Sequence, residues 1–469
     1  MKVLEALNHP VFDLLGEASR VVGLPAYVIG GYVRDFFLQR PCKDIDIVVE
    51  GSGIELAKAF ARQVGTKDVV IYANFGTALV NYKEFAVEFV GARKESYRKN
   101  SRNPKVETGT LKDDQLRRDF TINALSFSLN PESWGEVGDP FGGIKDLDTQ
   151  TIRTPTNPDI TFSDDPLRMM RAIRFATQLD FHIEDKTFHS IQQQARRIKI
   201  VSPERIIDEL NKIILAPLPS KGFKLLDKSG LLPLIFPELE AMKGVEYVNG
   251  RGHKDNFYHT IQVLDQVGEV SDNLWLRWVA LLHDIAKPLT KRFHPQGGWT
   301  FHGHEDKGAR MVPKIFRRMK LPMNEHMKYV QKLVKLHQRP VSLVTEPVSD
   351  SAIRRIIFEA GEDLEDLLTF CRADITSKNE AKVQRYLENY DRLAQRIMEV
   401  EERDQLRNWQ PPVDGTLIME TFDIPPGRQV GQIKTEIREA ILDGIIPNDR
   451  EAAISFMHEI ASKYLGEAR

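Results

Sequence analysis

Short apolar runs separated by turn residues occupy the chain from Ala26 to about Phe141. Six of these runs have the length and alternation typical of strands: YVIGG, DIDIVV, DVVIYA, TALVNY, AVEFVGA and NALSFSL. One or two helical segments lie between them. The pattern predicts a region built from a sheet and helices, and therefore an α+β fold for the first part of the chain.

Long helical patterns replace the strand pattern after the turn cluster DPFGGIKDLD, beginning at DDPLRMMRAIRFATQL. Breaks near Pro233 to Gly252, near Thr376 to Glu380 and at NWQPPVDG divide the helical part into three. We therefore expect four parts: a head domain at 1–150, a helical neck at 151–240, a helical body domain at 241–378 and a helical tail at 379–469.

The composition is that of a globular chain with more than one domain. The 469 residues exceed one ordinary core, and 41% are hydrophobic and 28% charged. No apolar run approaches the ~20 residues of a membrane span, and the first residues lack a secretory leader, so we expect a cytoplasmic protein with no membrane partner. Cys42 and Cys371 lie too far apart in sequence to suggest a disulfide framework. A net charge of −2 means that any nucleic acid must be bound by local basic patches.

Two aspartates in the run KDIDIVV suggest a metal site. Because strand side chains alternate, Asp44 and Asp46 point to one face and would repel each other unless a cation such as Mg²⁺ bound them. Upstream, Gly30 and Gly31 stand between a strand and a helix, where backbone amides can cradle phosphate. Each feature alone is also compatible with an ordinary solvated strand end or a plain turn.

The combination GGYVRD and DIDIVV resembles the nucleotidyltransferase superfamily, and more narrowly the class II tRNA nucleotidyltransferase (CCA-adding) and bacterial poly(A) polymerase family. The resemblance implies a polymerase-beta-like palm with a mixed or antiparallel sheet. It implies that Asp44 and Asp46 bind two Mg²⁺ ions that activate an RNA 3′-hydroxyl and stabilise pyrophosphate. Glu88 is placed to be a third carboxylate, or is an ordinary strand glutamate.

Further motifs of this family imply contacts with the nucleotide. The run RRDFTINAL resembles the motif that contacts sugar and triphosphate, although two adjacent arginines can also be a solvated pair. Residues assigned to nucleotide binding by resemblance in the head are Gly30, Gly31, Arg34, Asp35, Arg117, Arg118, Asp119 and Asn123.

The run DDPLRMMRAIRFA resembles the family's protein template for the incoming base. We expect a helix opening after Ser163, which would place Asp165 and Arg168 three residues apart on one face. An acceptor beside a donor matches cytosine and adenine and not uracil or guanine. The alternative is a plain salt bridge, and the role of Asp164 stays open. The resemblance adds Arg171 and Arg174 to the nucleotide contacts and implies that Glu204, Arg205 and Glu209 brace this helix.

The polar segment from Gly91 to Leu116 resembles the flexible catalytic loop of enzymes that complete CCA. Arg93, Lys94 and Arg98 could also meet phosphate, or the loop could be merely solvated. The basic signature that poly(A) polymerases of this family carry after the palm carboxylates is missing, and the chain reads ANFGTALV there. This favours CCA addition to tRNA from CTP and ATP, while CC-only, A-only and poly(A) addition remain alternatives.

Histidines and aspartates are concentrated in the third part, and such side chains suit a divalent transition metal. The order His…His-Asp…Asp resembles the HD phosphohydrolase superfamily and implies His259, His283, Asp284 and Asp374 as ligands. His304 would be a group behind the ligands or at a second metal. A phosphatase or cyclic phosphodiesterase acting on RNA ends, an inactive remnant, and a non-catalytic RNA-binding protein are the alternatives.

The region beyond Thr376 resembles the RNA-binding tail of long bacterial members of the family. Gly427 and Gly431 suit a tight turn between helices, which could present amides to tRNA phosphate or simply pack. The oligomeric state is not readable from the sequence.

Overall fold

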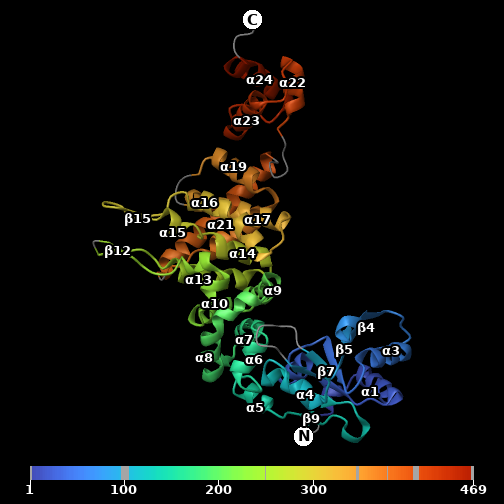
Figure 1. Ribbon diagram of the computed structural model, residues 1–469. Coiled ribbons are helices and arrows are strands. Elements are labelled where there is room, and N and C mark those ends of the chain that lie inside the picture. The colour runs from blue at the N-terminus through green and yellow to red at the C-terminus, as the bar shows by residue number, and fades with distance from the viewer. Residues whose placement is uncertain are drawn as a thin grey trace. The chain divides into compact units, whose positions relative to one another are not determined.

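The structure is a computed structural model and describes residues 3–96, 105–248, 250–344, 348–377, 379–404 and 411–465. The chain forms two compact units, Met1–Pro237 and Glu238–Arg469 (Figure 1), and each is described by itself. The break between them falls close to the boundary expected between 240 and 241. The finer division into four parts stays a prediction.

The first unit contains a mixed sheet. Within the described residues its strand order is β3-β4-β5-β2-β1-β8-β9. The strands are β1 (Ala26–Ile29), β2 (Asp44–Val49), β3 (Val69–Tyr72), β4 (Thr77–Tyr82), β5 (Phe85–Gly91), β8 (Ser126–Ser128) and β9 (Val137–Gly138). Strands β2 and β5 are parallel, and the other neighbouring pairs are antiparallel. Each of the six strand runs forms a strand, and the predicted α+β class is confirmed. Strand β9 is too short to show a pattern.

The alternation in β2 explains how the sheet presents polar groups beside a core. Ile45 and Ile47 are fully buried, whereas Asp44 is exposed and Asp46 is partly exposed. Helix α3 (Gly53–Gln63) packs on β4 and β5 and also on α1 (Pro10–Val22). The hydroxyl of Ser52 accepts a hydrogen bond from the Glu55 amide and fixes the start of α3.

Helices follow the sheet in the first unit. They are α5 (Gly143–Asp148), α6 (Pro158–Asp164), α7 (Leu167–Gln178), α8 (Asp185–Gln194), α9 (Pro203–Ile214), α10 (Pro219–Lys228) and α11 (Leu232–Ile235). Helix α7 packs against α9 and α10. Met169, Met170 and Ile173 of α7 are buried, and so is the charged side chain of Arg174.

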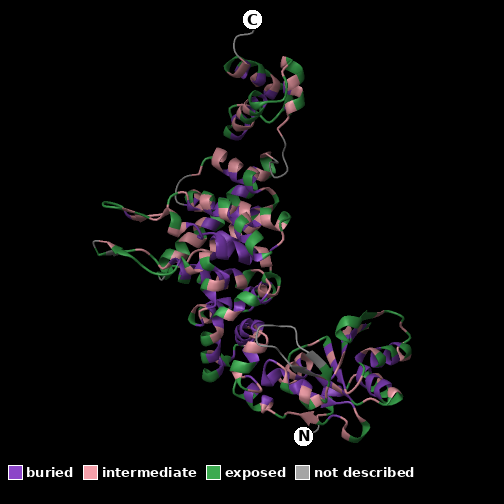
Figure 2. Cartoon of the chain, viewed as in Figure 1, coloured by how far each residue is buried: buried purple, intermediate pink, exposed green. Residues whose placement is uncertain are grey.

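The second unit is helical apart from two hairpins. Its helices include α13 (Asn256–Val270), α14 (Leu274–Leu282), α16 (His304–Met319), α17 (Glu325–Leu336), α19 (Asp350–Ala360), α20 (Leu364–Ala373) and α21 (Glu380–Asp404). The hairpins are β12 (Tyr247–Val248) with β13 (Arg251–Gly252), and β14 (Arg292–His294) with β15 (Gly298–Thr300). Buried residues gather around α14 (Figure 2), whose sequence LWLRWVALL is almost wholly apolar.

The end of the second unit has a small core of its own. It is formed by α22 (Gly415–Phe422), α23 (Arg428–Asp443) and α24 (Arg450–Leu465) around residues such as Ile433 and Met457. The expectation that Gly427 and Gly431 share a turn is wrong. Gly427 caps α23, whereas Gly431 lies inside its first turns. In the described residues, no helix is long and apolar enough to cross a membrane.

Candidate active site and metal centre

Three carboxylates lie on one face of the parallel pair β2 and β5. Asp46 is directly opposite Glu88 in the register, and Asp44 is opposite Ala86. Because the side-chain period is two, Asp44, Asp46 and Glu88 point to the same side of the sheet. The sheet thus places together the residues that the sequence suggested as a carboxylate cluster.

The carboxylates destabilise one another's charge. Burial raises the pKa of Asp46 although Arg118 opposes the shift, and the charge of Asp44 adds to it. Burial and then the charge of Asp46 raise the pKa of Glu88. Oxygen ligands that repel each other are what a hard divalent cation neutralises. The cluster therefore fits Mg²⁺, which would be held by Asp44 and Asp46.

Gly30 allows the backbone to pass close to this cluster. Its φ is +79°, and a Cβ placed there would lie 2.9 Å from Nη1 of Arg118 and 3.1 Å from Oδ2 of Asp46. Gly31 then begins α2 (Gly31–Phe37). Glycine at position 30 is required both by the backbone conformation and by the space.

Arg34 and Asp35, expected to contact nucleotide, also bind each other. Nε and Nη2 of Arg34 donate to the two carboxylate oxygens of Asp35 at 2.8 and 2.9 Å, and Nη1 donates to Oδ1 of Asn123 at 2.9 Å. The glycine turn is thereby connected to the RRDFTINAL segment. This pairing fixes the orientation of the Arg34 guanidinium, and the role of Asp35 in the structure is to hold it.

Asp114 is a residue that sequence reasoning missed. It is fully buried, and its carboxylate accepts from Nε of Arg117 at 2.9 Å and from Nε of Arg118 at 3.1 Å. It lies in α4 (Leu111–Leu116), three and four residues before the two arginines. This spacing could have predicted the contact from the sequence, because residues three and four positions apart on a helix are neighbours. Arg117 and Arg118 are thus a positioned pair and not two freely solvated cations.

Asp119 and Glu209 hold the arginines of α7. Oδ2 of Asp119 accepts from Nε of Arg171 at 2.6 Å, and Nε of Arg174 lies 3.2 Å from Oε2 of Glu209. Burial by itself would raise the pKa of Asp119, but the Arg171 charge and the Asn123 amide outweigh it and lower the pKa well below its usual value. Burial lowers the pKa of Arg174 to about 10. These residues form a buried, charged brace.

The aromatic ring of Phe175 completes this brace. The guanidinium carbons of Arg34, Arg171 and Arg174 lie 5.1, 5.4 and 4.0 Å from its centroid. Three cations on one buried ring, each with an acidic partner, define a rigid junction between the glycine turn and α7.

The expected helix start near Asp165 is wrong. Helix α6 ends at Asp164, Asp165 is extended, and α7 begins at Leu167. Pro166 disfavours helical conformation in the residue before it, which explains the interruption. Asp165 accepts from the Leu167 amide at 3.1 Å and from Nη2 of Arg205 at 2.8 Å. The Asp165 carboxylate therefore lies just before α7, and the Leu167 amide and Arg205 hold it in place.

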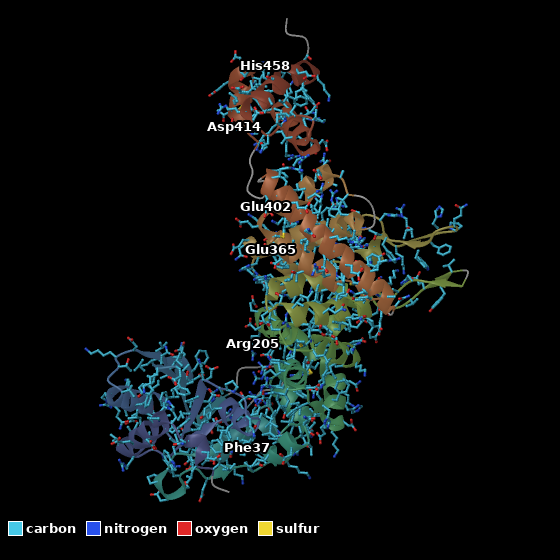
Figure 3. All side chains as sticks on the ribbon, turned by 180° about the vertical axis from the view of Figure 1, so that it is seen from behind. Phe37, Arg205, Glu365, Glu402, Asp414 and His458 are labelled. Carbon is cyan, nitrogen blue, oxygen red and sulfur yellow. The ribbon has the colours of Figure 1, made fainter. Side chains whose placement is uncertain are left out.

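Arg168 has a different partner from the salt bridge considered above. Its Nη2 donates to the carbonyl oxygen of Arg117 at 2.6 Å, which links the base-reading candidate to the RRDFTINAL motif. Arg205, labelled in Figure 3, lies on α9 and pairs with Asp165 ahead of α7, whereas Glu209 of the same helix pairs with Arg174 of α7 itself. Glu204 is exposed instead.

The segment between Gly91 and Leu116 is not simply a loop. Its described parts contain β6 (Arg93–Ser96), which pairs antiparallel with β7 (Lys105–Thr108), followed by α4. The amide of Leu111 donates to Oε1 of Glu50 at 2.8 Å and ties α4 to the end of β2. The side chains of Lys94 and Arg98, expected near phosphate, lie outside the described residues.

A second cluster lies in the helical unit. Nε2 of His259 is 3.0 Å from Oδ1 of Asp374 and 3.5 Å from Oδ2 of Asp284, and Nε2 of His283 is 3.2 Å from the same Asp284 oxygen. The structure thus brings together the four residues assigned to the HD site by resemblance. His259, His283 and Asp284 are arranged so that one ion could reach all three.

Asp284 also faces a second pair of histidines. Nε2 of His304 lies 3.2 Å from Oδ1 of Asp284 and 3.2 Å from Nε2 of His337. Asp284, His304 and His337 form a second trio that could hold an ion. His337 was not among the ligands expected from the sequence. Its adjacency to the other ligands arises only when the turn after α17 folds back on α16.

The histidine rings are oriented by their other nitrogens. Nδ1 of His283, His304 and His337 donates to the carbonyl oxygens of Ala280, Phe301 and Val334 at 2.8, 2.8 and 2.7 Å. Each Nε2 lone pair then points into the centre. Nε2 of His283 and Oδ1 of Asp284 are buried without a hydrogen-bond partner. Orphaned nitrogen and oxygen acceptors facing one point fit a divalent transition metal.

The charged groups of the centre shift the pKa values of its histidines in opposite directions. Burial alone would lower the pKa of His283, but Asp284 and Asp374 raise it. Burial and the nearby His283 lower the pKa of His337 to about 3. Nζ of Lys287 lies 2.6 Å from Oδ2 of Asp284.

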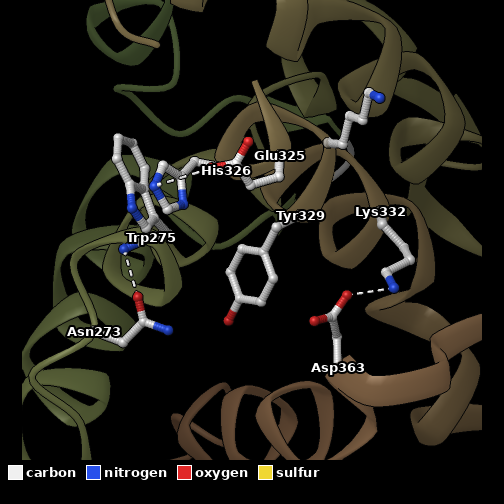
Figure 4. Close-up of a pocket in the computed structure, with 8 residues that line it drawn as sticks. Asn273, Trp275, Glu325, His326, Tyr329, Lys332 and Asp363 are labelled. Atoms are coloured by element: carbon white, nitrogen blue, oxygen red, sulfur yellow. Dashed lines mark hydrogen bonds and ion pairs between the residues drawn. The ribbon is translucent and has the colours of Figure 1, made fainter. Parts of the chain in front are cut away.

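A separate pocket of about 690 Å³ lies beside the first turns of α14 and α17 (Figure 4). The rings of Trp275 and His326 stack there with centroids 4.6 Å apart. The hydroxyl of Tyr329 donates to Asp366 at 2.6 Å, and Lys332 pairs with Asp363. The lining includes none of the residues of the two carboxylate-containing sites above.

The carboxylates on two adjacent strands beside a glycine turn, joined to an arginine-rich helix, define a nucleotidyltransferase-type palm. Family models agree: residues 26–153 match the poly A polymerase head domain, 180–243 match the probable RNA and SrmB-binding site of polymerase A, and 256–374 match the HD domain.

Relatives extend the match. The chain is 32% identical to an A-adding tRNA nucleotidyltransferase of Deinococcus radiodurans over 353 residues, 73% of this chain and 78% of that protein. It is 30% identical to the multifunctional CCA protein of Shewanella frigidimarina over 367 residues, covering 75% and 84%. The protein therefore belongs to the tRNA nucleotidyltransferase family of transferases, with an HD domain.

A solved structure shows the same fold. The Bacillus stearothermophilus CCA-adding enzyme in complex with CTP superposes with a TM-score of 0.70 at 20% identity, over 98% of this chain and 100% of that one.

Proposed function

We propose that this protein adds nucleotides to the 3′ end of tRNA, completing CCA from CTP and ATP with release of pyrophosphate. The observation that carries the proposal is the shared face of Asp44, Asp46 and Glu88 beside Gly30. The two named relatives, an A-adding tRNA nucleotidyltransferase and a multifunctional CCA protein, support it. The reaction would need no nucleic-acid template, because Asp165 and Arg168 of the neck would form the hydrogen bonds to the incoming base.

The residues of the chain have separate roles in this reaction. The 3′-hydroxyl oxygen of tRNA attacks the α-phosphorus, the bond to the bridging oxygen breaks, and pyrophosphate leaves while the hydroxyl proton is lost to solvent or a carboxylate. Mg²⁺, when bound to Asp44 and Asp46, would supply charge stabilisation to the attacking and leaving oxygens. Arg117 and Arg118, fixed by Asp114, supply positive charge for the triphosphate.

Asp165 and Arg168 would select the base. A carboxylate keeps acceptor capacity after two hydrogen bonds, and a guanidinium with one N–H given to Arg117 keeps four. An acceptor beside a donor matches the amino group and ring nitrogen of cytosine or adenine. Uracil and guanine present the reverse pattern and would leave these groups unpaired.

The test supplies tRNA ending before CCA, after C and after CC, each with one labelled nucleoside triphosphate at a time. Incorporation of C, C and A in turn supports the proposal, and Asp44→Ala/Asp46→Ala should abolish it. The control Asp13→Ala removes an exposed acid of α1. The core of the proposal fails if the double variant still incorporates CMP.

Addition of the terminal A alone is the second candidate, because the Deinococcus radiodurans relative bears that name. The same assay separates the two: an A-adding enzyme extends only tRNA that already ends in CC. Phosphohydrolase activity at the HD centre is a further proposal, supported by the two ligand trios that share Asp284.

A phosphohydrolase whose palm only positions RNA would lose all tRNA-linked activity in His283→Ala/Asp284→Ala and none in the palm double variant. A non-catalytic RNA-binding protein would show no Mg²⁺-dependent incorporation.

A further inference from the structure

The two hairpins of the second unit carry a cluster of aromatic rings. Hairpins β12–β13 and β14–β15 extend on the same side of this unit (Figure 1), and β13 lies against β15. The His253 ring is 5.3 Å from Trp299 and 5.9 Å from Phe301, and Phe293 is 5.3 Å from Trp299. We call His253, Phe293, Trp299 and Phe301 the aromatic platform. All four are partly exposed, although core packing would have buried such rings.

Lysines border the aromatic platform. Nζ of Lys291 lies 5.3 Å from the Trp299 ring centroid, and Nζ of Lys287 lies 5.5 Å from that of Phe301. Lys254 follows His253 directly. Acids face this border as well: Glu246 pairs with Lys291 at 2.5 Å, and Asp284 pairs with Lys287 at 2.6 Å. Lys254 and Lys287 remain on the side toward the HD centre.

The aromatic platform and the lysines that border it are connected to the HD centre by three polar contacts. The Phe301 carbonyl accepts from Nδ1 of His304, Nζ of Lys287 is 2.6 Å from Asp284, and Nζ of Lys254 is 3.2 Å from Nδ1 of His259. Two of these contacts come from the lysines, which therefore lie between the rings and the ligands. A molecule covering the rings would reach the centre past Lys254 and Lys287.

We propose that the aromatic platform binds the base of a nucleoside phosphate and that Lys254 and Lys287 receive its phosphate at the HD centre. Rings bordered by cations are the usual composition of sites for unpaired bases, since every base has a face that stacks. A lysine ammonium suits phosphate as a compact point charge. The ligand is a free nucleotide or the terminal nucleotide of an RNA, which share this chemistry. The inference concerns the HD centre and does not depend on nucleotide addition by the palm.

The experiment measures binding by calorimetry to the full-length, metal-free protein, so that it does not rest on hydrolysis. The probes are adenosine 3′-monophosphate, ribose 5-phosphate and a labelled short RNA with a 3′-phosphate. Trp299→Ala is compared with Trp275→Ala, which removes another partly exposed indole of the same unit. Because the palm also has nucleotide contacts, the readout is the difference between these two variants, both of which keep the palm intact.

Trp299→Ala should weaken adenosine 3′-monophosphate binding by about fivefold or more, the loss of one stacked base. Ribose 5-phosphate binding should be unchanged, and Trp299→Phe should keep most of the affinity. The RNA probe distinguishes the two ligands. If Trp299→Ala loses affinity for the RNA as well as for the mononucleotide, the ligand is an RNA end, and if it loses affinity for the mononucleotide alone, the ligand is a free nucleotide.

The inference is overturned if the two alanine variants bind the mononucleotide equally, or if Trp299→Ala loses both base-bearing and base-free probes. Should Trp299→Ala lower the melting temperature of the protein, His253→Ala provides the same comparison with a smaller ring.

Discussion

Nη2 of Arg168 donates to the carbonyl oxygen of Arg117 at 2.6 Å, across 51 residues of sequence. The side chain proposed to read the base is thereby tied to the segment proposed to contact the triphosphate. Base selection and phosphate binding should respond together to changes in either segment.

Arg168→Ala should alter the choice between CTP or ATP and UTP or GTP, and not only the rate. Arg197→Ala is a matched control, because its Nη2 also donates to a backbone carbonyl of the neck, that of Ser163, at 2.8 Å. The measurement is the ratio of kcat/KM values for the four nucleotides on tRNA ending after C, where CTP is the expected substrate, and after CC, where ATP is. An unchanged ratio at a reduced rate would contradict the selection role.

Asp114→Asn should raise KM for the nucleotide and lower stability by about 1–3 kcal/mol, since a buried hydrogen-bonded carboxylate loses its charge. Asp13→Asn changes the same chemistry on an exposed surface and should do neither. Urea unfolding and steady-state kinetics test both effects. A normal KM in Asp114→Asn would show that Arg117 and Arg118 do not depend on it.

Comparing Gly30→Ala with Gly23→Ala separates the effect of backbone strain from the effect of steric crowding by the added Cβ. Both glycines have positive φ, +79° and +68°, but a Cβ meets nothing within 4 Å at Gly23. Each substitution should cost about 1–2 kcal/mol of stability. Only Gly30→Ala should also reduce nucleotide addition, because its Cβ displaces Arg118 and Asp46. Equal activity of the two variants would count against the close approach at Gly30.

Asp119 gives a pH dependence of stability. Its folded-state pKa is lowered below the unfolded value of about 3.9, so the unfolded state takes up the proton first as pH falls. The stabilisation is complete above pH 4–5 and disappears as pH falls toward the lowered value. The difference in unfolding free energy between wild type and Asp119→Asn should therefore shrink from pH 7 to pH 3. A constant difference would refute this linkage.

Mn²⁺ or Ni²⁺ at a hundredfold excess over Kd should raise the unfolding temperature of the HD-containing unit by on the order of 5–10 °C. His337→Ala should reduce that rise, and a chelator should remove it. His294→Ala, an exposed histidine of β14, should leave it intact. Differential scanning calorimetry reports the change without any catalytic assay. A full rise in His337→Ala would exclude the second trio.

The sequence predicted the elements well and the partners poorly. Alternation was enough to place Asp44 and Asp46 on one face of β2, because a strand allows only two directions. The start of α7 was misplaced because the capping residues around Ser163 suggested an earlier start, and the effect of Pro166 on Asp165 was overlooked.

Long-range pairs could not be read from the sequence. Nothing local shows that Asp119 binds Arg171 or that His337 meets His304, since each pair forms only when separate helices pack. The pairing of Asp114 with Arg117 and Arg118 is the exception, because residues three and four apart on a helix are neighbours.

The three histidines whose Nδ1 atoms donate to backbone carbonyls have a consequence for metal uptake. Their rings are set by the fold before any ion arrives, so an ion need not order them and loses little affinity to reorganisation. The same rigidity means that ions preferring other distances or geometries cannot draw the ligands toward themselves. Discrimination between metals at this proposed centre would therefore be decided when the helices fold, and not when a metal binds.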